Sequence, residues 1–154
     1  MGWTVTQTNS GNTLALEGAF QALNGASVSY GWTEESADYP DGTSVINVAA
    51  YNHFGTATIP ARPILTTSFE RQSSELAALS EALNDEIIAS QTNDITPALT
   101  VIGQFAQSTL QRDFTRVSQD FAPLADSTIA RKGHDTPLID TGHLRAQVRF
   151  KVET

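Results

Sequence analysis

Apolar and polar residues alternate strictly at the C-terminal end of the chain. Val148, Phe150 and Val152 are separated by the charged residues Arg149 and Lys151. A period of two places one set of side chains on each face of a β-strand. We therefore predict a strand here, and its apolar face requires a core that the rest of the chain must supply.

The same alternation occurs in two earlier stretches. Val28, Tyr30 and Trp32 alternate with small or polar residues, which predicts a second strand. Residues 3–8 also alternate and predict either a strand or a loose arm. We expect the strands at the two chain ends to meet in one sheet, and we expect residues 1–12 to be flexible or to become ordered on assembly.

A helical period dominates the middle of the chain. Residues from Ile64 to about Ser90 predict one long helix, because apolar side chains recur there at spacings of three, four and seven. Its predicted apolar stripe is Phe69, Leu76, Leu79, Leu83 and Ile87. Thr96 and Pro97 suit the cap and the first turn of a second long helix that ends before Pro123. The predicted stripe of this helix is Leu99, Ile102, Phe105, Ala106, Leu110, Phe114 and Val117.

Two short helices precede the long ones, and the order of all elements predicts the fold class. The first short helix is expected at 13–23, and the second follows a cap at Thr43 or Ser44 and ends at Gly55. The segment 124–136 is polar and basic and predicts no regular element. The order is not a regular alternation of strands and helices. It predicts a single α+β domain over the whole chain, with a small, mainly antiparallel sheet packed against two long helices and the short helices.

Composition excludes several classes of protein. The chain has 154 residues, enough for one domain that buries a core without covalent cross-links. It has no cysteine, which excludes disulfides and thiolate metal sites and suits a reducing compartment. The chain contains no uninterrupted run of about 18 apolar residues, so no membrane span is predicted. The N-terminus lacks the pattern of a secretory signal.

The net charge of −8 is distributed unevenly. Residues 1–62 carry a net charge of −4 and residues 63–130 a net charge of −6, whereas residues 131–154 carry +2. A chain this acidic is poorly suited to coating nucleic acid through its phosphates. The acidity can serve solubility alone, or the acidic body and the basic end can support head-to-tail contacts between identical subunits.

Asp140, Thr141 and Gly142 match the active-site triplet of aspartic proteases, in which two aspartates share a proton. The triplet occurs once, and only 12 residues follow it. A dimer could supply the second aspartate, but a retroviral-type protease builds most of its sheet after the triplet. We therefore interpret these residues as a turn in which Asp140 or Thr141 forms a cap and Gly142 relaxes the backbone.

A second group with chemical potential consists of His134, Asp135, Asp140 and His143. The histidines are nine positions apart and so lack the i, i+4 spacing that places two metal ligands on one helix face. We expect no metal ligand, no catalytic residue and no cofactor. The alternative is a hydrolase that uses Asp140 with His134 or His143. His53 is interpreted as a packed or capping residue at a helix end.

Arg62 lies in a loop that two prolines stiffen. Pro60 and Pro63 restrict the backbone on either side of it, so the loop loses little entropy on docking. Arginine is also favoured at the centres of interfaces. The sequence leaves two interpretations open, a docking residue or a partner in a local salt bridge.

Four motifs, taken together, resemble a known family. The first two are residues 48–56, Val-Ala-Ala-Tyr-Asn-His-Phe-Gly-Thr, and residues 59–65, Ile-Pro-Ala-Arg-Pro-Ile-Leu. The others are residues 128–133, Thr-Ile-Ala-Arg-Lys-Gly, and residues 137–144, Pro-Leu-Ile-Asp-Thr-Gly-His-Leu. In this order, with two long helices between the pairs, they resemble the virion-morphogenesis proteins of tailed bacteriophages, that is, tail-completion or neck proteins, including the group found in Mu-like phages. The resemblance covers about residues 27–152.

The resemblance implies a small α+β subunit of a ring, commonly a hexamer, at the head–tail junction or at the top of the tail tube. Such proteins complete, terminate or connect tails and are not enzymes. The implied partners are further copies of the chain and the tail tube protein, the head-completion protein or both, while DNA passes through without sequence-specific binding. The implied location is the virion, after assembly in the host cytoplasm and without a membrane.

Rigidity and charge select the residues that we expect to contact other subunits or partners. They lie in the proline loop, at the basic segment and in the Asp-Thr-Gly turn. The expected contact residues are Ile59, Pro60, Arg62, Pro63, Ile64, Arg131, Lys132, Asp140 and Thr141. Family members often have Glu where this chain has His53 and Phe where it has Ile64, which weakens any role assigned to position 53.

Overall fold

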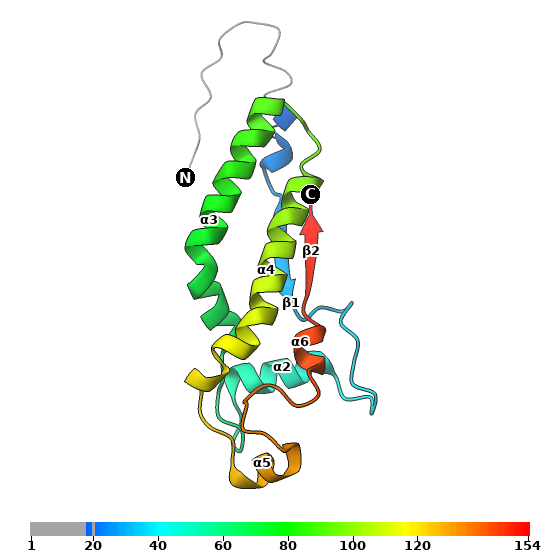
Figure 1. The fold of residues 1–154 in the computed structure, drawn as a ribbon. Coiled ribbons are helices and arrows are strands. Elements are labelled where there is room, and N and C mark those ends of the chain that lie inside the picture. Colours follow the sequence, from blue (N-terminus) through cyan, green and yellow to red (C-terminus); the bar gives the residue numbers. More distant parts are fainter. Residues whose placement is uncertain (1–17, 20) are drawn as a thin grey trace, which may run out of the picture.

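The computed structural model of the chain describes residues 18–19 and 21–154, and it confirms the α+β fold class (Figure 1). In chain order the elements are β1 (Ser27–Gly31), α2 (Val45–Phe54), α3 (Ile64–Ser90), α4 (Thr96–Arg116), the 3-10 helix η1 (Ser118–Asp120), α5 (Asp126–Lys132), α6 (His143–Ala146) and β2 (Arg149–Glu153). Residues 18–19 and 21–23 are also helical. The predicted strand or arm at 3–8 lies outside the described residues.

Helix α4 occupies the centre of the molecule. It packs against α3 on one side and against both strands on the other (Figure 1). The predicted stripe of α4 is largely confirmed, because Leu99, Ala106, Leu110, Phe114 and Val117 are buried. Since α4 contacts both α3 and the sheet, its two faces hold the fold together.

The sheet has two antiparallel strands among the described residues. β1 pairs with β2 in a register that places Val28 opposite Val152 and Tyr30 opposite Phe150. These four side chains belong to the apolar sets that the alternation predicted, and they share the face that α4 covers. The C-terminal strand therefore finds its partner at residues 27–31.

One glycine allows α4 to approach the sheet closely. A Cβ atom added to Gly103 would lie 2.1 Å from Phe150 Cδ2 and 2.6 Å from Phe150 Cγ. These atoms belong to a rigid ring on β2, so the ring has no easy way to move aside. The absence of a side chain at Gly103 thus sets the distance between the helix and the strand.

The face of α3 that packs inward differs from the predicted stripe at one end. Phe69 was expected in the core, but its side chain is 51% exposed, so that prediction is wrong. Ser68 and Gln72 are buried instead, on a line that continues through the half-buried Leu76 to the buried Ile87. Polar residues could take these positions because partners for their hydrogen bonds lie on the neighbouring elements.

These partners form a buried polar network between α3, α4 and β1. Ser68 Oγ donates to Asp113 Oδ2 at 2.7 Å, and Gln72 Nε2 donates to Ser68 Oγ at 3.3 Å and to Tyr30 Oη at 3.1 Å. Burial raises the pKa of Tyr30 above its ordinary value of 10.0, while the bond from Gln72 opposes this shift and the charge of Asp113 adds to it. Gln72 Oε1 is buried without a partner among the described residues.

Helix α5 falls in the segment for which no element was predicted. It starts at Asp126, whose carboxylate suits the positive end of the helix dipole, and it ends with Arg131 and Lys132, which suit the negative end. Gly133 follows in the left-handed conformation, with a φ of 79°, and its N–H donates to Ile129 O. The start and stop signals of a short helix were therefore present in the sequence, although an apolar period was not.

Candidate functional site

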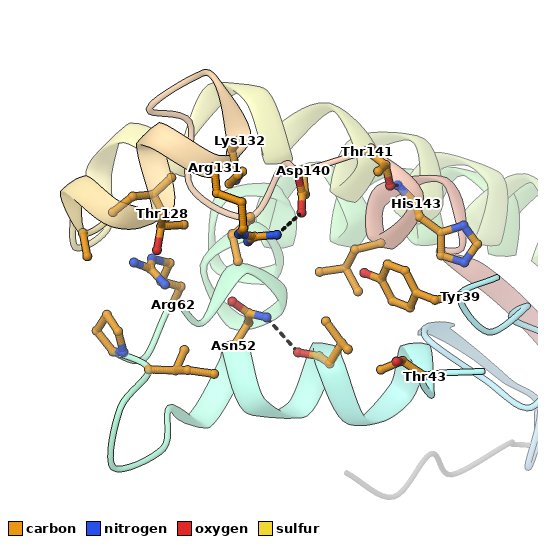
Figure 2. Close-up of a pocket in the computed structure, with 18 of the residues that line it drawn as sticks. Tyr39, Thr43, Asn52, Arg62, Thr128, Arg131, Lys132, Asp140, Thr141 and His143 are labelled. Carbon is orange, nitrogen blue, oxygen red and sulfur yellow. Dashed lines mark hydrogen bonds and ion pairs between the residues drawn. The ribbon is translucent and has the colours of Figure 1, made fainter. Parts of the chain in front are cut away.

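A cleft of about 720 Å³ lies at the end of the molecule where α2, α5 and α6 meet (Figures 1 and 2). Seven of the nine expected contact residues line it, namely Ile59, Pro60, Arg62, Arg131, Lys132, Asp140 and Thr141. The other two, Pro63 and Ile64, do not line the cleft, and Ile64 is buried in the core. Residues that are about 70 positions apart in the sequence are thus brought to one site.

One wall of the cleft is built on α2 and the proline loop that follows it. Ser44 Oγ accepts a hydrogen bond from Asn47 N and caps α2, which confirms one of the two predicted caps. Gly55 ends the helix with a φ of 76°, and a Cβ atom there would lie 2.9 Å from Ala61 N. Glycine at this position lets the proline loop fold back against the helix end.

Arg62 joins this wall to the segment after α4. Its side chain is 5% exposed, its Nε donates to Ala122 O at 3.0 Å, and its Nη2 donates to Pro123 O at 3.2 Å. Its backbone N–H donates to Asn52 O. Burial lowers the pKa of Arg62. No salt bridge of Arg62 is found among the described residues. The partners of its side chain there are backbone carbonyls.

The opposite wall carries the other two cations of the cleft. Arg131 Nη1 lies 3.5 Å from Asp140 Oδ2, in an ion pair whose side chains are both more than half exposed (Figure 2). Lys132 Nζ donates to Thr136 O at 3.0 Å. The pKa of Lys132 is lowered mainly by burial and also by the charges of Arg131 and Arg62, while Asp140 opposes the shift. The three cations therefore act on one another, and two carboxylates, one of them Asp140, belong to the same lining.

The turn at residues 138–143 closes the cleft near α6. Leu138 has a φ of 64°, which is rare for a residue with a branched side chain. Gly142 has a φ of 81°, which confirms its predicted role in relaxing the backbone, and Thr141 Oγ1 accepts from His143 N at 3.4 Å. The N-cap position of α6 is Gly142 itself, and no side chain of the described residues caps this helix. His143 Nε2 lies 2.9 Å from Ala37 O, and its ring centroid lies 4.5 Å from that of Tyr39 with the two ring planes tilted by 42°.

The contacts of Asp140, His134 and His143 bear on the catalytic and metal-binding interpretations of these residues. Asp140 pairs with Arg131, His143 with the Ala37 carbonyl, and His134 Nδ1 accepts from Thr136 N at 3.3 Å. No hydrogen bond joins Asp140 to either histidine within residues 18–19 and 21–154. In the same part of the chain, no group of three or more His, Asp or Glu side chains could hold a metal ion.

Sequence reasoning missed three exposed aromatic residues on α2 and in the first part of α3. Phe54 is 77% exposed, and Tyr51 and Phe69 are each about half exposed. His53 links the helices there, because its Nε2 lies 3.3 Å from Thr66 Oγ1 and its ring packs edge-on against Phe54. The interpretation of His53 as a packed residue at a helix end is therefore confirmed. The spacing of Phe69 fits the core stripe, although its side chain is exposed.

The part of the chain that the structure describes contains no helix long and apolar enough to cross a membrane. Comparison with models of known protein families, with curated proteins and with solved structures gives no match for this chain. The family resemblance of the four motifs therefore stays a prediction.

Proposed function

We propose that the chain is a structural subunit of a tailed-bacteriophage virion. It forms a ring at the head–tail junction or at the top of the tail tube, where it completes or terminates the tail or connects it to the head. Its neighbours are copies of itself and the tail tube protein, the head-completion protein or both. DNA passes through the ring without sequence-specific binding.

The observation that carries this proposal is the convergence of the four motifs on one cleft. Motifs 48–56 and 59–65 build one wall, and motifs 128–133 and 137–144 build the other. Backbone hydrogen bonds and buried side chains hold both walls, as the bonds of Arg62 and His143 show. A site with a fixed shape and little entropy to lose suits permanent docking between proteins.

The alternative of a hydrolase has less support. A general base must lie within hydrogen-bond reach of the group that it activates. Asp140 is paired with Arg131, and the ring nitrogens of His134 and His143 for which contacts exist face backbone groups. Loss of a hydrolytic activity in a folded Asp140→Ala variant would revive this alternative.

The test uses the phage or prophage whose genome encodes the chain. Purified particles are expected to contain the protein, as mass spectrometry can establish. Deletion of the gene is expected to yield heads and tails that fail to join, or tails of abnormal length, in electron micrographs. The proposal is wrong if particles lack the protein and the deletion leaves normal, infectious virions.

The contact surface can be tested in the same system with Arg131→Glu/Lys132→Glu. Arg62 is a poor choice, because its buried side chain supports the fold. The matched control is Arg145→Glu/Lys151→Glu, which changes one exposed arginine and one exposed lysine outside the cleft. We expect the cleft variant to reduce the yield of complete particles at least about tenfold, as loss of a central charged contact does. Equal yields from both variants would remove the cleft from the contact surface.

A further inference from the structure

An acidic stretch of the chain lies at the end of the molecule opposite the cleft. Between Gln72 and Gln111 the sequence contains five acidic residues and neither lysine nor arginine. These acidic residues are Glu75, Glu81, Asp85, Glu86 and Asp94, and all five are exposed. Figure 1 shows that the turn between α3 and α4 projects at the opposite end from α2, α5 and α6. We refer to residues 81–94 as the acidic tip.

The cleft is lined by three cations, Arg62, Arg131 and Lys132, and by two carboxylates, Asp41 and Asp140, so it carries an excess of positive charge. Arg62 and Lys132 donate to backbone carbonyls and make no ion pair in the part of the chain that the structure describes. Arg131 has one carboxylate partner, Asp140, at the long distance of 3.5 Å. Because Arg62 is almost completely buried, an anionic group that enters the cleft meets a charge poorly screened by water.

We infer that the acidic tip of one copy docks into the basic cleft of a second copy. The inference rests on the proposed function, because it names the neighbour that occupies the contact surface of the ring subunit. The tip is a projecting helical turn with four carboxylates, and the cleft is a hollow lined by three cations. The two surfaces are different parts of the same chain, so the contact is heterologous. Repetition of such a contact gives a closed ring or an open filament.

A second copy fits this cleft better than other anions. Nucleic acid would bring phosphates toward a chain with a net charge of −8, which opposes binding over most of the surface. A small oxyanion would leave the apolar part of the lining, including Ile59, Leu124 and Leu138, exposed to water. A protein surface that carries carboxylates covers more of this lining than a small oxyanion does, and the acidic tip adds the half-buried Leu83 and Ile88.

The inference is tested by reversing the charge of each surface in separate proteins. The tip variant is Asp85→Lys/Glu86→Lys, and its matched control is Glu34→Lys/Glu35→Lys, another adjacent and exposed acidic pair. The cleft variant is Arg131→Glu/Lys132→Glu, with the milder Arg131→Gln/Lys132→Gln if the first fails to fold. Circular dichroism checks each fold, and sedimentation equilibrium measures the mass of each protein up to about millimolar concentration.

A head-to-tail contact predicts a specific result when variants are mixed. Wild type and control are expected to self-associate, and high salt should weaken this association. The tip variant alone and the cleft variant alone should each associate at least about tenfold more weakly than wild type. An equimolar mixture of tip and cleft variants retains one intact tip and one intact cleft, so it should associate into dimers or larger species although neither variant does so alone. A chain that carries both reversals should self-associate again, because its two surfaces are once more opposite in charge.

Three results would overturn the inference. They are a wild type that stays monomeric at every concentration, variants that self-associate like wild type, and a mixture that forms no dimer. Binding of inorganic phosphate by the monomer, with no self-association, would assign the cleft to small oxyanions instead. The proposed function fails separately, when purified virions lack the protein, so a failed mixing experiment leaves that question to the particles.

Discussion

Helix α4 packs against the sheet and against α3 through different kinds of contact. On the sheet side, α4 approaches β2 so closely that Gly103 lies directly against the ring of Phe150, and Phe114 packs edge-on against Trp32 at 6.0 Å. On the α3 side, Asp113 is buried in a polar network with Ser68. The sheet side therefore depends on volume, whereas the α3 side depends on hydrogen bonds, and the two should respond to different substitutions.

The largest expected effect is a volume change on the sheet side. Gly103→Ala places a methyl group 2.1 Å from Phe150 Cδ2, and overpacking of this kind costs about 3 kcal/mol, against a gain of about 1 kcal/mol from helix propensity. We expect the free energy of unfolding to fall by about 2 kcal/mol in urea denaturation. In a Phe150→Ala background the same substitution should become stabilising by up to about 1 kcal/mol. An equal loss in both backgrounds would show that Phe150 does not limit the approach.

The next effect is the loss of one hydrogen bond on the α3 side. Ser68→Ala leaves Asp113 Oδ2 without its donor in a buried site, which should lower the free energy of unfolding by about 1 to 2 kcal/mol. The control is Ser73→Ala, on the same helix, whose hydroxyl donates to Glu70 O at an exposed position and should matter by less than about 0.5 kcal/mol. If the two variants are equally stable, the network contributes nothing beyond filling space.

The smallest effect is a dependence on pH that the network imposes through Tyr30. Burial raises the pKa of Tyr30 above 10.0, so the folded state retains the phenolic proton to a higher pH than the unfolded state does. The resulting stability is fully present below the unfolded pKa and is lost as the pH rises through the folded pKa. Tyr30→Phe should therefore make the free energy of unfolding fall less steeply above about pH 10 than wild type. If Tyr30→Phe and wild type show the same slope, the phenol of Tyr30 does not link stability to pH.

Much of this fold could be predicted because its elements carry strong periods. Two strands with period two and two long helices with a period of 3.6 appear where the sequence places them. The predictions for α3 were wrong where hydrogen-bond partners on other elements, and not the spacing of apolar residues, decide which side chains are buried. Phe69 fits the apolar spacing but faces water, and Gln72 sits in the core, because Asp113 and Tyr30 offer partners that no local pattern reveals. Helix α5 was missed because seven residues are too few to show an apolar stripe.

The members of the site could be chosen from the sequence, but their arrangement could not. Proline stiffness and basic charge selected seven residues that line the cleft. The burial of Arg62 could not be foreseen, since its carbonyl partners, Ala122 and Pro123, follow η1 and approach only when the long helices have turned the chain back. The opposition of the acidic tip and the cleft also depends on the tertiary fold, because sequence position gives no direction in space.

The bonds of Arg62 also set an order of events in folding. They span 60 and 61 residues, and the chain between them contains the whole of α3 and α4. The entropy of closing so long a loop is recovered only when the helical hairpin inside it has formed, so the cleft is completed after the hairpin. A nascent chain thus completes the cleft only as its last quarter folds. If the cleft docks a neighbour as proposed, half-made subunits lack the contact surface.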